Sequence, residues 1–124
     1  MSHPSILLLD DDDFIVRLVS HQLSTGYALS TCQTCSAARR SLQETPFDVL
    51  LLDVQLPNGS GCDVLHSART HPESLNTETP AIAFTAHVLG DIRERLLDEG
   101  FDAYLAKPFH AAQLVGTIES LLPA

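Results

Sequence analysis

Short apolar runs alternate with segments of helical periodicity along the whole chain. Five runs have the length of buried strands, and the segments between them place apolar side chains three and four positions apart, as one face of an amphipathic helix does. The pattern predicts strands over 6–9, 27–31, 49–52, 81–84 and 103–106, and helices over 13–23, 36–44, 62–69, 91–99 and 111–122.

Strands that alternate with helices imply a parallel sheet joined by right-handed crossovers. We therefore predict an α/β, doubly wound fold with five parallel strands and five helices, in which 71–79 is a surface loop. The helical periodicity also predicts which side chains face the core: Ile15, Leu18, Val19, Leu23, Ala37, Ala38, Leu42, Ile92, Leu96, Leu97, Leu114, Val115, Ile118 and Leu121.

Length and composition are those of one ordinary globular domain. The chain has 124 residues, of which 44% are hydrophobic and 19% charged, and we expect a single domain over 1–124. The longest apolar stretches are about five residues, far short of a membrane span. The first residues lack the basic and long apolar regions of a signal peptide, so a cytoplasmic protein with no membrane partner is expected.

The charge balance restricts the class of partner. Seven basic and sixteen acidic residues give a net charge of −9. This balance argues against nucleic acid as a direct partner, because phosphate backbones bind basic patches. It favours a divalent cation or a basic protein surface.

Two of the three cysteines form a C-x-x-C motif, Cys32 and Cys35. Such a pair can be a redox motif or half of a zinc site, but a structural zinc site needs a second ligand pair, and none stands out. The simpler interpretation is two small, semi-buried residues where a strand gives way to a helix.

Polar residues with complementary chemistry follow four of the predicted strands. Four acids, 10–13, follow the first strand, Asp53 follows the third, Thr85 the fourth and Lys107 the fifth. Each has an ordinary explanation by itself; a run of acids, for example, is often a solvated turn or a helix start. In a doubly wound sheet, however, these positions meet at one edge, and together they predict a functional site there.

A cation and a phosphoryl group fit this set of side chains. Carboxylates about 4 Å apart repel by roughly 4 kcal/mol at an effective dielectric constant near 20. Mg²⁺, which takes one or two carboxylates with waters and phosphate oxygens, relieves this repulsion. Lys107 and Thr85 would then bind the oxygens of a phosphoryl group that arrives at Asp53, since carboxylates are known covalent phosphoryl acceptors.

The chain resembles the receiver domain of two-component response regulators over essentially its whole length. The matching segments are 6–12, 51–53 with Pro57 and Gly61, 83–86 and 102–109, and their order and spacing are highly specific. The segment 82–104 looks most similar to receivers of hybrid sensor kinases and phosphorelays. The resemblance implies a flavodoxin-like fold with strand order 2-1-3-4-5 and a single receiver domain over 1–124.

The resemblance also implies a phosphoacceptor and a metal site. Asp53 would accept the phosphoryl group. Asp11 would bind Mg²⁺ (or Mn²⁺) directly, Asp10 would assist through water, and Asp53 and the backbone carbonyl of Gln55 would be further ligands. The donor would be a histidine kinase or a histidine phosphotransfer domain, and the chain would be no enzyme beyond promoting its own phosphorylation and dephosphorylation.

The remaining implied roles concern the response to phosphate. Lys107 would contact the phosphoryl group and Thr85 would donate a hydrogen bond to it. Tyr104 matches the aromatic switch residue, which turns inward as Thr85 moves, so that the surface around 91–99, 103–106 and 111–122 changes. Gln55 and His87 flank the site and would tune the phosphoryl lifetime.

One departure and two alternatives remain. Many relatives have proline where this chain has Asp13, and the fourth acid either alters metal affinity or begins the helix. A phosphohydrolase of the haloacid dehalogenase type would use Asp10 and Asp12, but it needs an acidic pair after Lys107, where only Glu119 remains. A degenerate receiver that acts by constitutive contact is disfavoured, since no residue needed for phosphorylation is missing.

Overall fold

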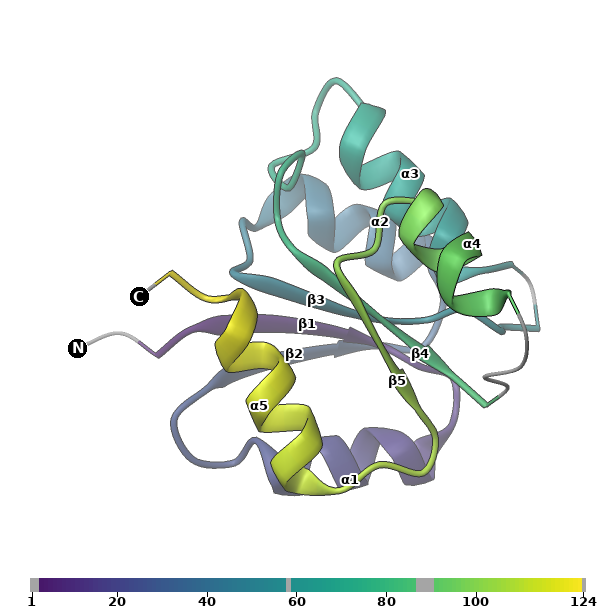
Figure 1. Ribbon diagram of the computed structural model, residues 1–124. Helices are drawn as coiled ribbons and strands as arrows, with labels where there is room; N and C mark the ends of the chain where they lie inside the picture. The colour runs from purple at the N-terminus through teal and green to yellow at the C-terminus, as the bar shows by residue number, and fades with distance from the viewer. Residues whose placement is uncertain (1–2, 58, 87–90, 124) are drawn as a thin grey trace.

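A single parallel sheet forms the centre of the molecule (Figure 1). The computed structural model describes residues 3–57, 59–86 and 91–123. In these ranges five strands pair in parallel in the order β2-β1-β3-β4-β5, as predicted. Their bounds are β1 Ser5–Leu9, β2 Ala28–Cys32, β3 Val49–Asp53, β4 Ala81–Thr85 and β5 Ala103–Ala106.

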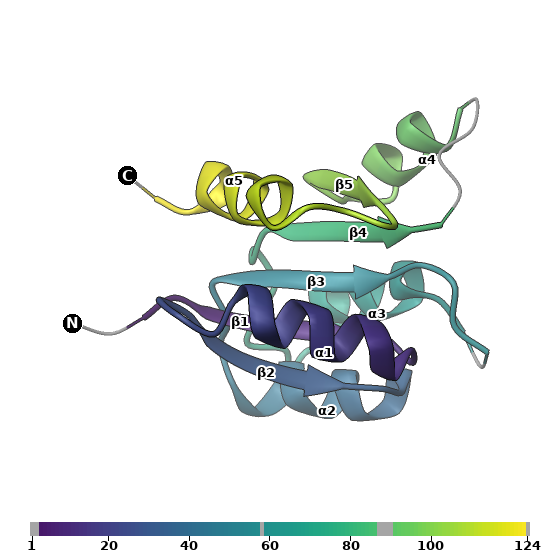
Figure 2. The same ribbon diagram turned by 90° about the horizontal axis from the view of Figure 1, so that it is seen from below.

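Helices cover both faces of the sheet (Figures 1 and 2). Helices α1 and α5 lie on one face and α2, α3 and α4 on the other, and each group closes its own cluster of buried side chains. Every predicted strand and helix is present, with ends that shift by one residue at most. The helices are α1 Asp13–Gln22, α2 Cys35–Glu44, α3 Gly61–Thr70, α4 Ile92–Asp98 and α5 Ala111–Leu121.

Burial follows strand position in the sheet. All five residues of β3 and all five of β4 are buried, which explains why apolar runs rather than alternating patterns mark these strands in the sequence. The edge strand β2 is largely exposed. Each fully buried leucine or isoleucine contributes about 1.5–3 kcal/mol by leaving water, so the central strands and their helices dominate the stability.

The predicted inward face is wrong at one position of α4. Leu97 is 45% exposed, whereas Leu96 is buried and Ile92 half-buried. Successive helix residues point about 100° apart, so a short helix that packs through Leu96 turns its neighbour outward. The other positions predicted to face inward are buried or half-buried.

The connection between α3 and β4 is exposed along most of its length, but it contains a buried amide that the sequence did not indicate. Asn76 is 1% exposed. Its Oδ1 accepts hydrogen bonds from the Phe47 amide at 2.8 Å and the Thr79 hydroxyl at 2.9 Å. Its Nδ2 donates to the carbonyls of Leu42 and Thr45, both at 2.9 Å. This one side chain therefore fastens the loop to the end of α2 and the start of β3.

The C-x-x-C motif lies where β2 gives way to α2. Cys32 and Cys35 are free thiols, both buried within the core cluster under α2, α3 and α4. This placement matches the packing interpretation. Within the described ranges, no helix is long and apolar enough to cross a membrane.

Candidate functional site

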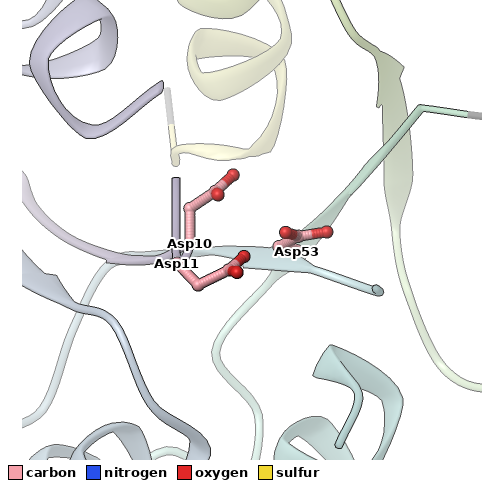
Figure 3. A group of neighbouring side chains, drawn as sticks. All are labelled: Asp10, Asp11 and Asp53. Carbon is pink, nitrogen blue, oxygen red and sulfur yellow. The ribbon is translucent and has the colours of Figure 1, made fainter. Parts of the chain in front are cut away.

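Three carboxylates meet at the carboxyl edge of the sheet, where β1 and β3 end (Figure 3). One oxygen from each of Asp10, Asp11 and Asp53 can be chosen so that all lie within 4.8 Å of one another. Lys107, which follows β5, places its Nζ 2.7 Å from Asp10 Oδ2 and 3.3 Å from Asp53 Oδ2. Residues that are far apart in the sequence thus form one cluster, at the edge where the strand pattern predicted it.

The four consecutive acids have separate structural roles. Asp10 is fully buried, and its Oδ1 accepts the Asp12 amide at 2.9 Å. Asp12 caps α1, because its Oδ1 accepts the Phe14 amide at 2.8 Å. Asp13 is the first residue of α1, and its Oδ1 accepts a hydrogen bond from Gln33 Nε2 at 2.6 Å. The fourth acid therefore does begin the helix.

Asp53 is the most enclosed member of the cluster after Asp10. It is 3% exposed, its Oδ1 accepts the Gln55 amide at 2.9 Å, and its Oδ2 faces Lys107. Burial raises the pKa of Asp53 above its ordinary value, the neighbouring Asp10 adds to this, and the Gln55 amide and Lys107 oppose it. A buried carboxylate with a raised pKa at a strand end is a typical functional group.

Lys107 supplies the positive charge at this edge. Burial acts to lower the pKa of Lys107, but the carboxylates of Asp10 and Asp53 together outweigh burial and raise it. The ammonium therefore stays charged at neutral pH and offsets part of the repulsion between the two acids. Its side chain is 16% exposed, so the group can reach a ligand that enters from solvent.

A close backbone contact fixes the start of α3 against the end of β3. A Cβ placed on Gly61 would lie 2.5 Å from the carbonyl oxygen of Asp53, a distance that no side chain tolerates. Ser60 caps the helix, because its Oγ accepts the Cys62 amide at 3.0 Å. Glycine at this position therefore allows the loop that contains Gln55 to pack closely onto the acidic edge.

Three of the other predicted site residues are among those that the structure describes. Thr85 is fully buried at the end of β4, and its carbonyl accepts the Lys107 amide at 2.8 Å. Tyr104 on β5 is half-buried and packs against the core cluster beneath α4. The side chain of Gln55 is exposed, and His87 lies outside the described residues.

Sequence reasoning missed Gln33. It lies in the loop between β2 and α2, and it lines a small hollow of about 70 Å³ beside Asp11. Only the pairing of β1 with β2 brings Gln33 to the acidic segment, and no local motif marks such a contact.

The donor set fits a hard divalent cation. Within the described residues, Asp10, Asp11 and Asp53 are the one group of three potential ligands placed to share a metal. All three offer carboxylate oxygens, the ligands that Mg²⁺ prefers. Asp11 is exposed and accepts no hydrogen bond from the described part of the chain, so its oxygens are available.

The alternative that the chain is a phosphohydrolase of the haloacid dehalogenase type has no support. A hydrolase of this type would need Asp12 as a second catalytic carboxylate beside Asp10, but Asp12 caps α1.

A family model and curated relatives identify the chain. The model for the response regulator receiver domain matches residues 6–119. The transcriptional regulatory protein PrrA of Mycobacterium leprae is 31% identical over 123 residues, which cover 98% of this chain and 51% of that protein. The sensor histidine kinase GacS of Pseudomonas protegens is 31% identical over 117 residues, 93% of this chain and 13% of that protein. The chain thus spans about half or less of these relatives.

Solved structures agree with the sequence matches. One similar structure is the receiver domain of the sensor histidine kinase PA1611 from Pseudomonas aeruginosa, solved with a magnesium ion in its active site cleft. It has a TM-score of 0.86 and 30% sequence identity, and the match covers 97% of this chain and 98% of that chain. The structure of the chemotaxis protein CheY4 of Vibrio cholerae has a TM-score of 0.89 and 26% sequence identity. The match covers 98% of this chain and 100% of the CheY4 chain. The chain therefore belongs to the response regulator receiver domain family of two-component signalling.

Proposed function

We propose that this receiver accepts a phosphoryl group from a phosphohistidine onto Asp53 and responds by changing the surface around α4, β5 and α5. The observation that supports this most strongly is the meeting of the buried Asp53 with two carboxylates and one ammonium at a single edge of the sheet. Residues 1–124 act as one receiver domain in this proposal.

In the transfer step, an oxygen of Asp53 attacks phosphorus as the P–N bond to the donor imidazole breaks. The imidazole, which carries a proton on its other ring nitrogen, leaves as the neutral ring. Asp10, Asp11, Asp53 and the backbone carbonyl of Gln55 would hold Mg²⁺, or Mn²⁺ in its place. Bound there, the metal neutralises charge between the carboxylates and the phosphoryl oxygens. The Gln55 amide keeps Asp53 Oδ1 in place, which leaves Oδ2 on the side of Lys107.

Lys107 and Thr85 respond to the product. The Lys107 ammonium is shared between Asp10 and Asp53 before transfer, and it moves to the phosphoryl oxygens after transfer. Thr85 donates a hydrogen bond to the same oxygens from the end of β4, and Tyr104 turns inward behind it. This response is a two-state element biased by one local charge event. Gln55 and His87 set how fast water removes the phosphate.

A histidine kinase, a histidine phosphotransfer domain or both supply the phosphate. Support comes from the similarity to receiver segments of the histidine kinases GacS and BarA. Phe14, at the start of α1, is 68% exposed, so an apolar side chain stands in solvent close to the acidic edge. Such a residue suits contact with a donor protein that brings its histidine to Asp53.

Phosphorylation by a small acyl phosphate tests the proposal. The protein is incubated with Mg²⁺ and the donor, and its intact mass is measured. We expect one phosphoryl increment on the wild type and on the control Asp98→Asn, an exposed acid on α4, and none on Asp53→Asn.

Two results would contradict the proposal. Absence of an increment on the wild type would favour a degenerate receiver. Catalytic turnover of the donor that is lost on Asp10→Asn but kept on Asp53→Asn would favour a hydrolase.

A further inference from the structure

A side-chain hydrogen bond joins the acidic segment to the neighbouring loop. Gln33 Nε2 donates to Asp13 Oδ1 at 2.6 Å, across 20 positions of sequence. We infer that Gln33 is a positioning residue for the metal site, which holds Asp11 where it can bind Mg²⁺. This inference rests on the proposed function, because it assumes that Asp11 is a metal ligand.

Asp11 needs such support because its own side chain has none. Its carboxylate is exposed and accepts no hydrogen bond within the described ranges, so the backbone of 10–13 determines where it points. Asp10, in contrast, is buried and bound by Lys107. A ligand that is not held in place loses conformational entropy when metal binds, and fixing it beforehand strengthens binding.

Two consecutive residues hold both ends of the acidic segment. The carbonyl of Cys32 accepts the Asp10 amide at 3.1 Å, and the side chain of the next residue, Gln33, binds Asp13. Asp11 lies between these two attachments, and Gln33 borders the small hollow beside it. Loss of the Gln33 bond would therefore detach Asp13 from the loop between β2 and α2, while the bond from Asp10 to Cys32 and the first turn of α1 remain.

Gln33 also fixes Asp13 without cancelling its charge. The amide is neutral, so the negative charge of Asp13 still contributes to the field that attracts a cation. A lysine or arginine at 33 would hold Asp13 as well, but it would add a positive charge near the metal. The residue type thus suits a role in metal binding better than a role in stability alone.

Calorimetric titration with Mg²⁺ on the unphosphorylated protein tests the inference. Gln33→Met keeps the length and the net charge but removes the donor, and we expect Mg²⁺ to bind roughly threefold to tenfold more weakly. The double variant Asp13→Asn with Gln33→Glu keeps the net charge and restores the bond with its direction reversed, so binding should return to within about twofold of the wild type. Gln43→Met, near the far end of α2, is the matched control.

The outcomes separate this inference from the proposed function. If the wild type binds no Mg²⁺, or Asp11→Ala leaves binding unchanged, the metal site itself is wrong and the inference falls with it. If Asp11→Ala abolishes binding while Gln33→Met binds as the wild type does, only the inference is overturned. The inference is also overturned, and the proposed function kept, if the double variant binds Mg²⁺ as weakly as Gln33→Met does. A lower melting temperature of Gln33→Met in chelator, which would show that the fold as a whole is destabilised, has the same meaning.

Discussion

Lys107 is the positive charge that two buried acids of the site share. Its ammonium lies against Asp10 at 2.7 Å and Asp53 at 3.3 Å, in the region where a cation shared by those acids would bind. A fixed positive charge there repels a divalent ion, although it steadies the carboxylates in the ion's absence. We therefore expect Lys107 and a bound metal to compete for the two carboxylates.

Replacement of Lys107 by methionine should separate these two effects. In chelator we expect a lower melting temperature, because two buried acids lose their counter-charge. In a calorimetric titration we expect Mg²⁺ to bind roughly tenfold more tightly, equivalent to about 1.4 kcal/mol. Arg95→Met, which removes a positive charge from α4, is the control and should change neither quantity by as much. Weaker Mg²⁺ binding by Lys107→Met would show that the lysine organises the ligands rather than competing for them.

Asp53 should make stability depend on pH in a particular direction. Its pKa is raised on folding from an ordinary value of 3.8, so the folded protein keeps this proton to a higher pH than the unfolded chain does. The contribution of Asp53 to the free energy of unfolding therefore falls as pH rises from about 3.8 through the folded pKa, and is constant above it. Asp53→Asn should consequently stabilise the protein more at pH 7 than at pH 4.

Denaturant melts of the wild type and of Asp53→Asn, in chelator and at several pH values, measure how much the substitution stabilises the fold. Added Mg²⁺ should reduce it, since the metal binds the folded wild type and stabilises it by mass action. A stabilisation by Asp53→Asn that shrinks with rising pH would mean that the charged form of Asp53 is favoured by folding.

At the scale of elements, the connection from β3 to α3 sets how closely the acidic edge is packed. The Asp53 carbonyl and Gly61 approach each other so closely that a single added methyl group has no room. Since the contact is between two backbones, no side-chain rotation can relieve it.

Two glycine substitutions should have opposite effects. Gly61→Ala must push α3 away from β3, and we expect it to cost about 1–3 kcal/mol of stability and to slow phosphorylation by acyl phosphate. Gly116→Ala on α5 is the control: a Cβ there meets nothing within 4 Å, so it should stabilise the helix by about 0.5–1 kcal/mol. Urea melts give both values, and equal effects at the two positions would contradict the role assigned to Gly61.

The elements were more predictable than the contacts between them. Apolar runs of strand length located β1, β3 and β4 because these strands are covered on both faces, so their burial appears directly in the sequence. The carboxyl ends of parallel strands meet at one edge of a doubly wound sheet, and this predicted that Asp10, Asp53 and Lys107 would lie close together.

Leu97, Asn76 and Gln33 could not be predicted in this way. The outward turn of Leu97 depends on how a seven-residue helix is seated on the sheet. The bonds of Asn76 and Gln33 join loops that are distant in sequence, and a polar residue in a loop gives no sign of its partner. The roles of Thr85, Tyr104 and Gln55 remain predictions.

The whole molecule presents an acidic surface to its partners, with a net charge of −9. Phosphorylation would replace the carboxylate charge of Asp53 by a phosphoryl group of about −1.5 to −2, a net gain of about −0.5 to −1. We therefore expect recognition of a donor to combine long-range attraction to a basic surface on the donor with short-range apolar contact. Phe14 is the exposed aromatic residue closest in sequence to the acidic segment.

Phe14→Ala should slow phosphoryl transfer from a phosphohistidine protein by roughly tenfold, equivalent to about 1.4 kcal/mol, because it removes an apolar contact. The rate with a small acyl phosphate should not change. Leu75→Ala is the matched control, since Leu75 is 52% exposed in the connection before β4, at the opposite edge of the sheet. Equal slowing by both variants, or slowing with the small donor, would contradict a docking role for Phe14.

The small buried face of α4 also affects how readily this helix opens. This helix contributes one buried side chain, Leu96, and its first turn lacks a side-chain cap, whereas α3 contributes four buried residues. Few buried contacts mean a small free energy of local opening, so α4 should unfold and refold many times while β3 stays closed. Its backbone amides should exchange with deuterated water before those of α3. We therefore expect the receiver to combine a stable acceptor strand with a helix that opens readily, whose structure a small charge change can alter.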